Sequence, residues 1–63
     1  MSANNLIKVF QTFKGTWSAA EYDADTGAEN TFISNEMTME DAVNKAKEYI
    51  EKVDHEIEYG IQV

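Results

Sequence analysis

The sequence predicts an α+β fold, a two-layer β-β-β-α-β sandwich in which a three-stranded antiparallel meander and a C-terminal strand pack on one helix. Three observations predict it. Segments of strand-forming residues are separated by glycine-containing turns in the first half of the chain. Apolar residues at helical spacing follow residue 38, and near the C-terminus apolar residues recur at every second position. A chain of 63 residues has room for one core, so we expect one domain over 1–63 with a flexible N-terminus over 1–5.

The first two strands are predicted as a hairpin in which Lys14-Gly15 joins residues 6–13 to residues 16–22. A two-residue turn at this position sets Lys8 opposite Glu21. A second turn over 23–27, with acidic side chains that can bond their own backbone and a glycine for positive φ, leads to a third strand near 28–33.

The helix is predicted to begin at Thr38, because a hydroxyl followed three residues later by Asp41 has the form of a capping box. Apolar residues then recur at spacings of three and four, namely Met39, Ala42, Val43, Ala46, Tyr49, Ile50 and Val53. The other faces carry charge pairs four residues apart, namely Asp41/Lys45, Lys47/Glu51 and Glu48/Lys52. This stripe is expected to cover one face of the sheet.

Alternation predicts the last strand, in which Ile57, Tyr59, Ile61 and Val63 share one buried face. The first strand is apolar on both faces, and Trp17 and Tyr22 fall on opposite faces of the second. At least one large aromatic side chain is therefore expected on the sheet face away from the helix. That face is a contact surface, a dimer interface, or a minor apolar cluster under a loop.

Charge is the strongest functional signal. The formal net charge is −7, and residues 21–36 hold Glu21, Asp23, Asp25, Glu29 and Glu36 without a Lys or Arg. Glu56 and Glu58 lie in the predicted last strand and Asp54 directly precedes it, so these acids and those of residues 21–36 are expected to merge into one negative field. Direct binding of nucleic acid is disfavoured, because affinity for phosphates comes mainly from Lys and Arg, of which the chain has five.

Several chemistries are not indicated. Absence of cysteine excludes disulfides and thiolate metal sites and favours a reducing, cytoplasmic setting, and no stretch has the apolar length of a membrane span. Residues 23–29 start like a calcium loop, but Gly27 stands where a ligand is required and Ser34 where a bidentate Glu is required. His55 is the only imidazole, and no nucleophile motif accompanies it. We expect no metal, no cofactor and no enzymatic activity.

Two patterns resemble known families. Gly15, Trp17, Tyr22, Thr26-Gly27, Phe32 and Thr38-x-Glu40-Asp41-Ala42 together resemble the arm-binding domains of phage integrases, which have a three-stranded sheet packed on a helix. Those domains read DNA with a cationic sheet, whereas this segment is acidic, so the resemblance implies the fold and not the function. Residues 37–49 are similar to the helix of antitoxins with the HicB-like fold, without their proline- and glycine-containing segment. In size, charge and layout the chain also looks like small acidic phage proteins that inhibit host RNA polymerase or defence nucleases.

The sequence therefore favours a cytoplasmic, non-enzymatic binding protein, of a kind that phages and mobile elements encode. It would dock on a basic surface of a host nucleic-acid enzyme or defence complex and imitate nucleic acid there. The expected contact residues are Glu21, Asp23, Asp25 and Glu29, with Phe10 or Trp17 as an apolar anchor. The alternatives are a self-associating module, a homodimer through a sheet face or edge, and an antitoxin-like regulator.

Overall fold

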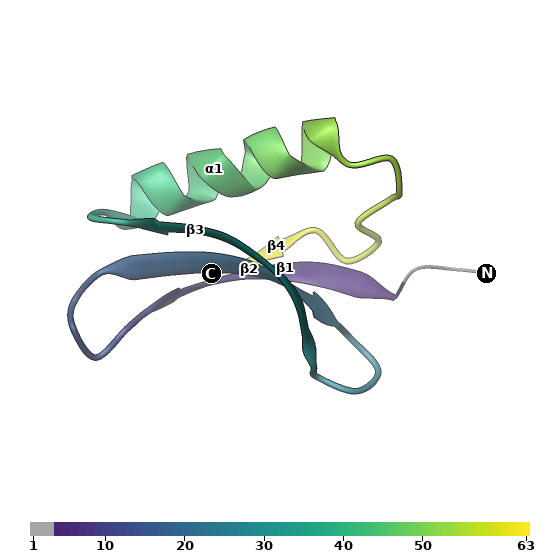
Figure 1. The fold of residues 1–63 in the computed structure, drawn as a ribbon, viewed down its shortest axis with the longest axis horizontal. Coiled ribbons are helices and arrows are strands. Elements are labelled where there is room, and N and C mark those ends of the chain that lie inside the picture. The colour runs from purple at the N-terminus through teal and green to yellow at the C-terminus, as the bar shows by residue number, and fades with distance from the viewer. Residues whose placement is uncertain (1–3) are drawn as a thin grey trace.

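The computed structural model describes residues 4–63, and its architecture confirms the predicted fold class (Figure 1). The elements in chain order are β1 (Asn5–Gln11), β2 (Trp17–Asp23), β3 (Glu29–Glu36), α1 (Met39–Lys52) and β4 (Ile61–Gln62). The sheet order is β3-β2-β1-β4, with β4 parallel to β1 and the other pairs antiparallel. The sheet is therefore mixed, and α1 lies along one of its faces (Figure 1).

The β1–β2 hairpin differs from the predicted register by one residue. Ile7 lies opposite Glu21, and Lys8 lies opposite Ala20. The turn is longer than predicted, because the backbone N–H of Gly15 donates to the carbonyl of Thr12 at 2.9 Å. Gly15 has φ of 90°, so this turn needs the left-handed region at the glycine, and Lys14 keeps a negative φ.

The second turn forms where it was predicted. Asp23 Oδ1 accepts the backbone N–H of Asp25 at 2.8 Å, and Gly27 has φ of 77°. The following strand runs to Glu36, three residues beyond the predicted 28–33. Two register irregularities in the β2–β3 pairing leave Asn30 and Ile33 without an opposite residue in β2, and such bulges increase the local twist of an edge strand.

The helix begins as predicted, with Thr38 Oγ1 accepting the backbone N–H of Asp41 at 3.1 Å. The predicted stripe faces the core except at Met39, which is 43% exposed: Ala42 and Ala46 are fully buried, and Val43, Tyr49, Ile50 and Val53 pack against them. The predicted charge pairs four residues apart do not form. Within residues 4–63, the ion pairs that do form both involve His55, in keeping with the small net gain of exposed pairs on a helix surface.

The predicted C-terminal strand is wrong over most of its length, because only Ile61 and Gln62 pair with β1. Ile57 is buried, but Tyr59 is 53% and Val63 is 71% exposed. The cause is Gly60, which has φ of 68° and donates its N–H to the carbonyl of Ile57 at 3.3 Å. A turn therefore stands where the alternating pattern indicated extended backbone.

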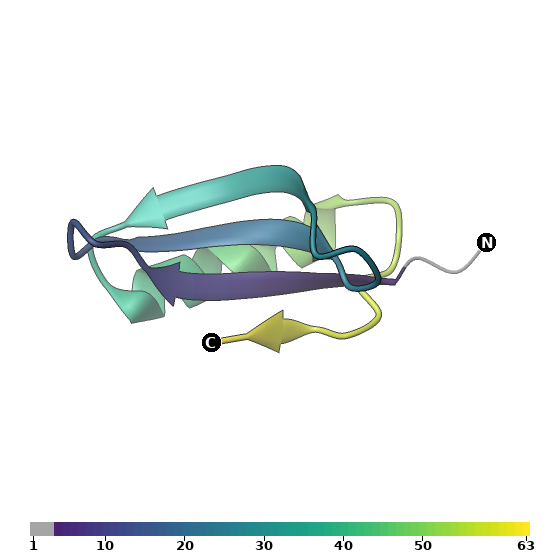
Figure 2. The same cartoon turned by 90° about the horizontal axis from the view of Figure 1, so that it is seen from below.

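The hydrophobic core lies between α1 and the sheet. Its buried members are Ile7, Val9, Ala19, Ala42, Ala46 and Ile57. Trp17 packs against this core from β2, so it belongs to the helix-facing side. Among residues 4–63 no further element covers the opposite face, which Figure 2 shows from below. The pairings place Phe10, Tyr22 and Phe32 on that open face.

Two further placements follow from these elements. Residues 1–3 of the expected flexible N-terminus lie outside the described residues, whereas Asn5 is the first residue of β1 and Asn4 accepts the backbone N–H of Ala24 at 2.6 Å. In the part of the chain that the structure describes, no helix has the length and apolar character needed to cross a bilayer.

Candidate functional site

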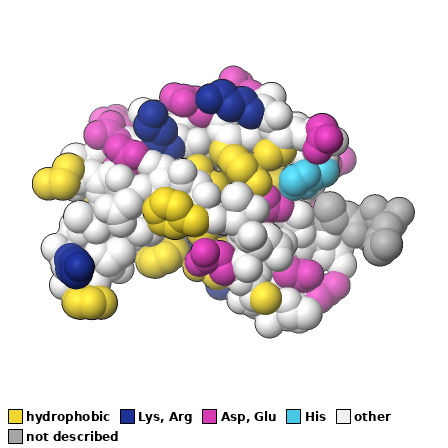
Figure 3. Space-filling model, viewed as in Figure 1, with side chains coloured by type: hydrophobic (Ala, Val, Ile, Leu, Met, Phe, Trp, Pro, Cys, Tyr) yellow, Lys and Arg dark blue, Asp and Glu magenta, His cyan; other side chains and the backbone are white. Residues whose placement is uncertain are grey.

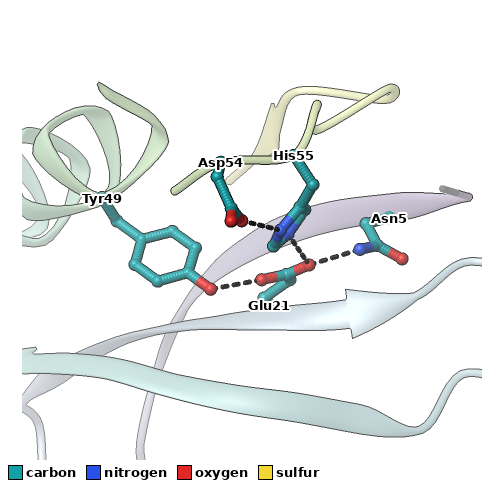
Figure 4. Close-up of polar contacts among 5 residues, drawn as sticks. All are labelled: Asn5, Glu21, Tyr49, Asp54 and His55. Atoms are coloured by element: carbon teal, nitrogen blue, oxygen red, sulfur yellow. Dashed lines mark hydrogen bonds and ion pairs between the residues drawn. The ribbon is translucent and has the colours of Figure 1, made fainter. Parts of the chain in front are cut away.

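A buried polar cluster centres on Glu21, the β2 residue that faces the helix (Figure 4). The hydroxyl of Tyr49, on α1, donates to Glu21 Oε1, and the side-chain amide of Asn5 donates to Glu21 Oε2. His55 Nε2, from the α1–β4 loop, lies 3.0 Å from the same Oε2. Asp54 Oδ1 lies on the other side of the imidazole, 3.7 Å from Nδ1. The cluster thus joins β1, β2, α1 and the loop.

Burial makes these contacts necessary. The side chain of Glu21 is 2% exposed, and a carboxylate removed from water needs hydrogen-bond donors or a cation to offset its lost hydration. Both oxygens have hydrogen-bond partners, and Nε2 of His55, which is 40% exposed, approaches Oε2 from the side open to solvent. Burial, and next the hydrogen bond to Glu21, raise the pKa of Tyr49 above its ordinary value of 10.0.

The contacts of this cluster tie Glu21 to three other parts of the fold. A carboxylate beside an imidazole resembles an acid–base pair, but such a pair must reach a substrate. The oxygens of Glu21 are instead occupied by side chains from three other parts of the fold. Glu21 was expected to contact a partner, but the structure buries it, because a side chain on the helix-facing side of a central strand is covered by the helix and its following loop.

Two acidic loops meet at the end of the molecule where β1 starts (Figure 1). Asn4 Nδ2 donates to Asp25 Oδ2 at 2.6 Å on one side of that start, and the carbonyl of Asn5 accepts the N–H of Tyr59 at 3.1 Å on the other. The β2–β3 turn and the α1–β4 loop therefore flank the same two residues. We name the carboxylates of these loops the acidic end: Asp23, Asp25, Asp54, Glu56 and Glu58.

The acidic end is open to solvent and not neutralised by lysine. Asp23 is half-buried and the other four carboxylates are exposed. No Lys forms an ion pair with any of them within residues 4–63. Figure 3 shows acidic side chains above and below the histidine at this end of the molecule, and others along the helix side and toward the opposite end. Such a concentration of one charge produces a field that attracts cationic surfaces and repels phosphates.

The remaining acids of the 21–36 segment are placed elsewhere. Glu29 is exposed on β3, with its Oε1 3.4 Å from the hydroxyl of Tyr22, and Glu36 lies opposite Trp17 at the far end of the sheet. Burial, then the charge of Glu29 and its hydrogen bond, raise the pKa of Tyr22. The structure thus brings together only Asp23 and Asp25 from the acids of this segment.

Neither expected aromatic anchor belongs to the acidic end. Phe10 is 40% exposed on the open face, but it lies five residues along β1 from Asn5, or roughly 17 Å at the usual rise of a strand. Trp17 is half-buried against the core. On the open face, Lys8 Nζ lies 4.8 Å from the centroid of the Tyr22 ring, a distance at which a cation and an aromatic ring attract each other.

Tyr59 is the aromatic residue next to Glu58 in the α1–β4 loop, and the alternating pattern predicted a buried strand face for it. It is 53% exposed, and its backbone N–H donates to the carbonyl of Asn5. The glycine directly after it is the signal that indicates a turn here. Tyrosine is enriched in protein interfaces because one side chain offers both apolar area and a hydroxyl.

A shallow groove of about 210 Å³ lies between α1 and β3, lined by Ile33, Lys45, Glu48, Tyr49 and Lys52. It is smaller than the roughly 300–1,000 Å³ of most small-molecule sites. Among residues 4–63 no three His, Cys, Asp or Glu side chains are grouped as ligands for a metal ion. The carboxylates of the acidic end are dispersed over two loops, which suits a broad protein contact better than coordination of one ion.

Comparison with known proteins found no matching family model, no matching curated protein and no matching solved structure. The resemblances to integrase arm-binding domains and HicB-like antitoxins stay similarities of pattern and layout. The function is therefore argued from the residues of this chain.

Proposed function

We propose that this chain is a non-enzymatic binding protein that docks its acidic end on a basic surface of another protein. The observation that carries the proposal is the meeting of the β2–β3 turn and the α1–β4 loop on either side of Asn4 and Asn5. Residues more than 25 positions apart in the chain thereby present their carboxylates together.

Electrostatics and an aromatic contact would act together in this complex. Carboxylates at one end, with no lysine paired to them within residues 4–63, steer a cationic partner toward that end and raise the association rate, most strongly at low ionic strength. Tyr59 lies within the same surface and supplies apolar area that excludes water once the partner has arrived. The backbone of Tyr59 is fixed by Asn5, so little conformational entropy is lost on binding.

The class of partner follows from the sign of the field. Broad basic protein surfaces are typical of proteins that hold nucleic-acid backbones, since phosphate affinity depends on Lys and Arg. A rigid, negatively charged end can occupy such a surface and exclude the nucleic acid from it. We therefore propose inhibition or modulation of a nucleic-acid enzyme or a defence complex by mimicry, without direct contact between this chain and nucleic acid.

The test compares two charge reversals of equal size in capture from host lysate. Glu56→Lys with Glu58→Lys changes the acidic end, and neither side chain takes part in a hydrogen bond or ion pair in the structure. Glu48→Lys with Glu51→Lys makes the same charge change on the exposed side of α1 and is the matched control. The unchanged protein and the control should retain a basic nucleic-acid-binding protein that the first variant loses.

Two further measurements examine the mechanism. Increasing salt should release the captured protein, and a short DNA duplex should compete with the chain for it, because both depend on the same cationic surface. Equal retention by the two charge-reversed variants would contradict the proposal, since the location of the charge would then not matter.

A further inference from the structure

His55 lies between two carboxylates of very different exposure (Figure 4). Its Nε2 atom lies 3.0 Å from Oε2 of Glu21, whose side chain is 2% exposed. Its Nδ1 atom lies 3.7 Å from Oδ1 of Asp54, whose side chain is open to solvent. Each ring nitrogen therefore faces a carboxylate oxygen, and the ring is exposed enough for a proton to reach it from solvent.

The two protonation states of an imidazole suit this position differently. A neutral ring has one N–H, which can donate to Glu21, and its other nitrogen then presents a lone pair to the carboxylate of Asp54. A protonated ring has an N–H on both nitrogens and brings a positive charge into contact with the buried carboxylate. Among residues 4–63 no Lys lies within ion-pair distance of Glu21. The protonated ring therefore makes the stronger contact.

The other groups around this contact keep their charge near neutral pH. Asn5, from β1, is uncharged, and its side-chain amide donates to Glu21 Oε2. Tyr49, from α1, donates its hydroxyl to Oε1, and burial, followed by this hydrogen bond, raises the pKa of the hydroxyl above its ordinary value of 10.0. Carboxylates such as Glu21 and Asp54 ordinarily titrate near about pH 4. The group that changes charge between about pH 5 and 8 is therefore the imidazole.

The contact also anchors the loop that carries part of the acidic end. The α1–β4 loop is held farther along by the buried side chain of Ile57 and by the N–H of Tyr59, which donates to the carbonyl of Asn5 at 3.1 Å. Over residues 54–56, which the structure describes in full, the contact of His55 with Glu21 is the one hydrogen bond to the sheet. The first half of the loop thus depends on this side chain.

We propose that the contact of His55 with Glu21 is a pH-sensitive latch on the α1–β4 loop, and we name it the His55 latch. When the ring is protonated, the loop is fastened to β2, and Glu56 and Glu58 keep their places at the acidic end. When the ring is neutral, a weaker hydrogen bond remains and the loop opens more often. The effect of the latch on binding rests on the proposed function, whereas its effect on the loop does not.

Amide hydrogen exchange of the free chain, followed by NMR, tests the latch. The N–H of Tyr59 reports opening of the loop. The N–H of Thr12, which donates to the carbonyl of Thr16 at 2.8 Å in the β1–β2 turn, is the comparison. After correction for intrinsic rates, protection at Tyr59 should be about fivefold or more higher near about pH 5.5 than near about pH 8, because the charge strengthens the hydrogen bond. Protection at Thr12 should stay nearly constant.

Two variants assign the effect to the ring. His55→Gln keeps a side-chain N–H but carries no charge at any pH, so it should abolish the pH dependence at Tyr59. Asp54→Asn removes only the carboxylate beside Nδ1 and should reduce the dependence. In the unchanged chain, the midpoint of the change should coincide with the titration of the His55 ring, followed by its own NMR signals. Circular dichroism of each variant checks that the fold is kept.

Three results would overturn the latch: protection at Tyr59 that does not depend on pH, a dependence that persists in His55→Gln, or an equal change at Thr12, which would make the effect global. Binding is a separate measurement. A captured basic protein should be released more readily at the higher pH from the unchanged chain but not from His55→Gln. Failure to capture any partner at either pH would contradict the proposed function alone, because exchange in the free chain involves no partner.

Discussion

Replacing Tyr49 with Phe removes one hydroxyl from the interior and leaves the ring in place. That hydroxyl donates to Glu21 Oε1, and the carboxylate is 2% exposed, so water cannot readily replace the lost donor. A hydrogen bond to a charged group contributes about 1.5–3 kcal/mol to stability. A domain of this length is stabilised by roughly 3–9 kcal/mol in total. We therefore expect Tyr49→Phe to remove about a sixth or more of the free energy of unfolding.

The assay is urea denaturation followed by circular dichroism, with thermal unfolding as a second measure. For a small domain, a loss of this size lowers the melting temperature by roughly 10–20 °C. Tyr59→Phe is the matched control, because Tyr59 is 53% exposed and loss of an exposed hydroxyl changes stability by about 0.5 kcal/mol or less.

A Tyr49→Phe protein within about 0.5 kcal/mol of the unchanged chain would refute this reasoning. That result would mean that Asn5 and His55 alone compensate the buried carboxylate. Glu21 would then depend on two of its partners and not on all three.

Three further predictions concern stability. Because the pKa of Tyr49 is raised in the folded chain, the unfolded chain releases the phenol proton first, and the free energy of unfolding should fall as the pH rises above about 10. Urea titrations at several alkaline pH values should show a smaller fall for Tyr49→Phe, because only the raised pKa of Tyr22 then contributes. Gly15→Ala should lower the free energy of unfolding by about 1–2 kcal/mol through backbone strain alone, since φ is 90° and a Cβ would meet nothing within 4 Å. An unchanged urea midpoint would contradict the described turn. Ile7→Ala should cost about 2–5 kcal/mol, because Ile7 is fully buried in the core; calorimetry should show a large loss of folded protein at room temperature.

Local patterns in the sequence predicted most elements of the fold. The Thr38 cap, the glycine of the second turn and the period of the helix all act between residues a few positions apart. The C-terminal strand was predicted wrongly for the same reason: alternation is a local signal, but pairing with β1 depends on where the chain arrives after the helix. Gly60 indicates a turn within this segment, whereas the alternating residues indicate extended backbone. The sequence alone does not decide which of the two signals prevails.

The expected contact residues illustrate the same limit. A change of one residue in the hairpin turn places Glu21 opposite Ile7, and burial under α1 converts a supposed surface carboxylate into an interior one. Tyr59 was missed because its exposure follows from a turn and not from its neighbours' composition. Asp23 and Asp25 were expected at the surface and lie at the acidic end, where loop residues far along the chain join them.

By itself the sequence determined the fold class, the start of the helix, the turn at residues 23–27 and the strongly negative charge, since each depends on composition or on short-range geometry. Only the tertiary structure decided which carboxylates share a surface, which one is buried, and which aromatic side chains meet solvent. These properties depend on strand register and on the return of the chain after α1, where contacts between distant residues are made and a shift of one position changes which side chains meet solvent.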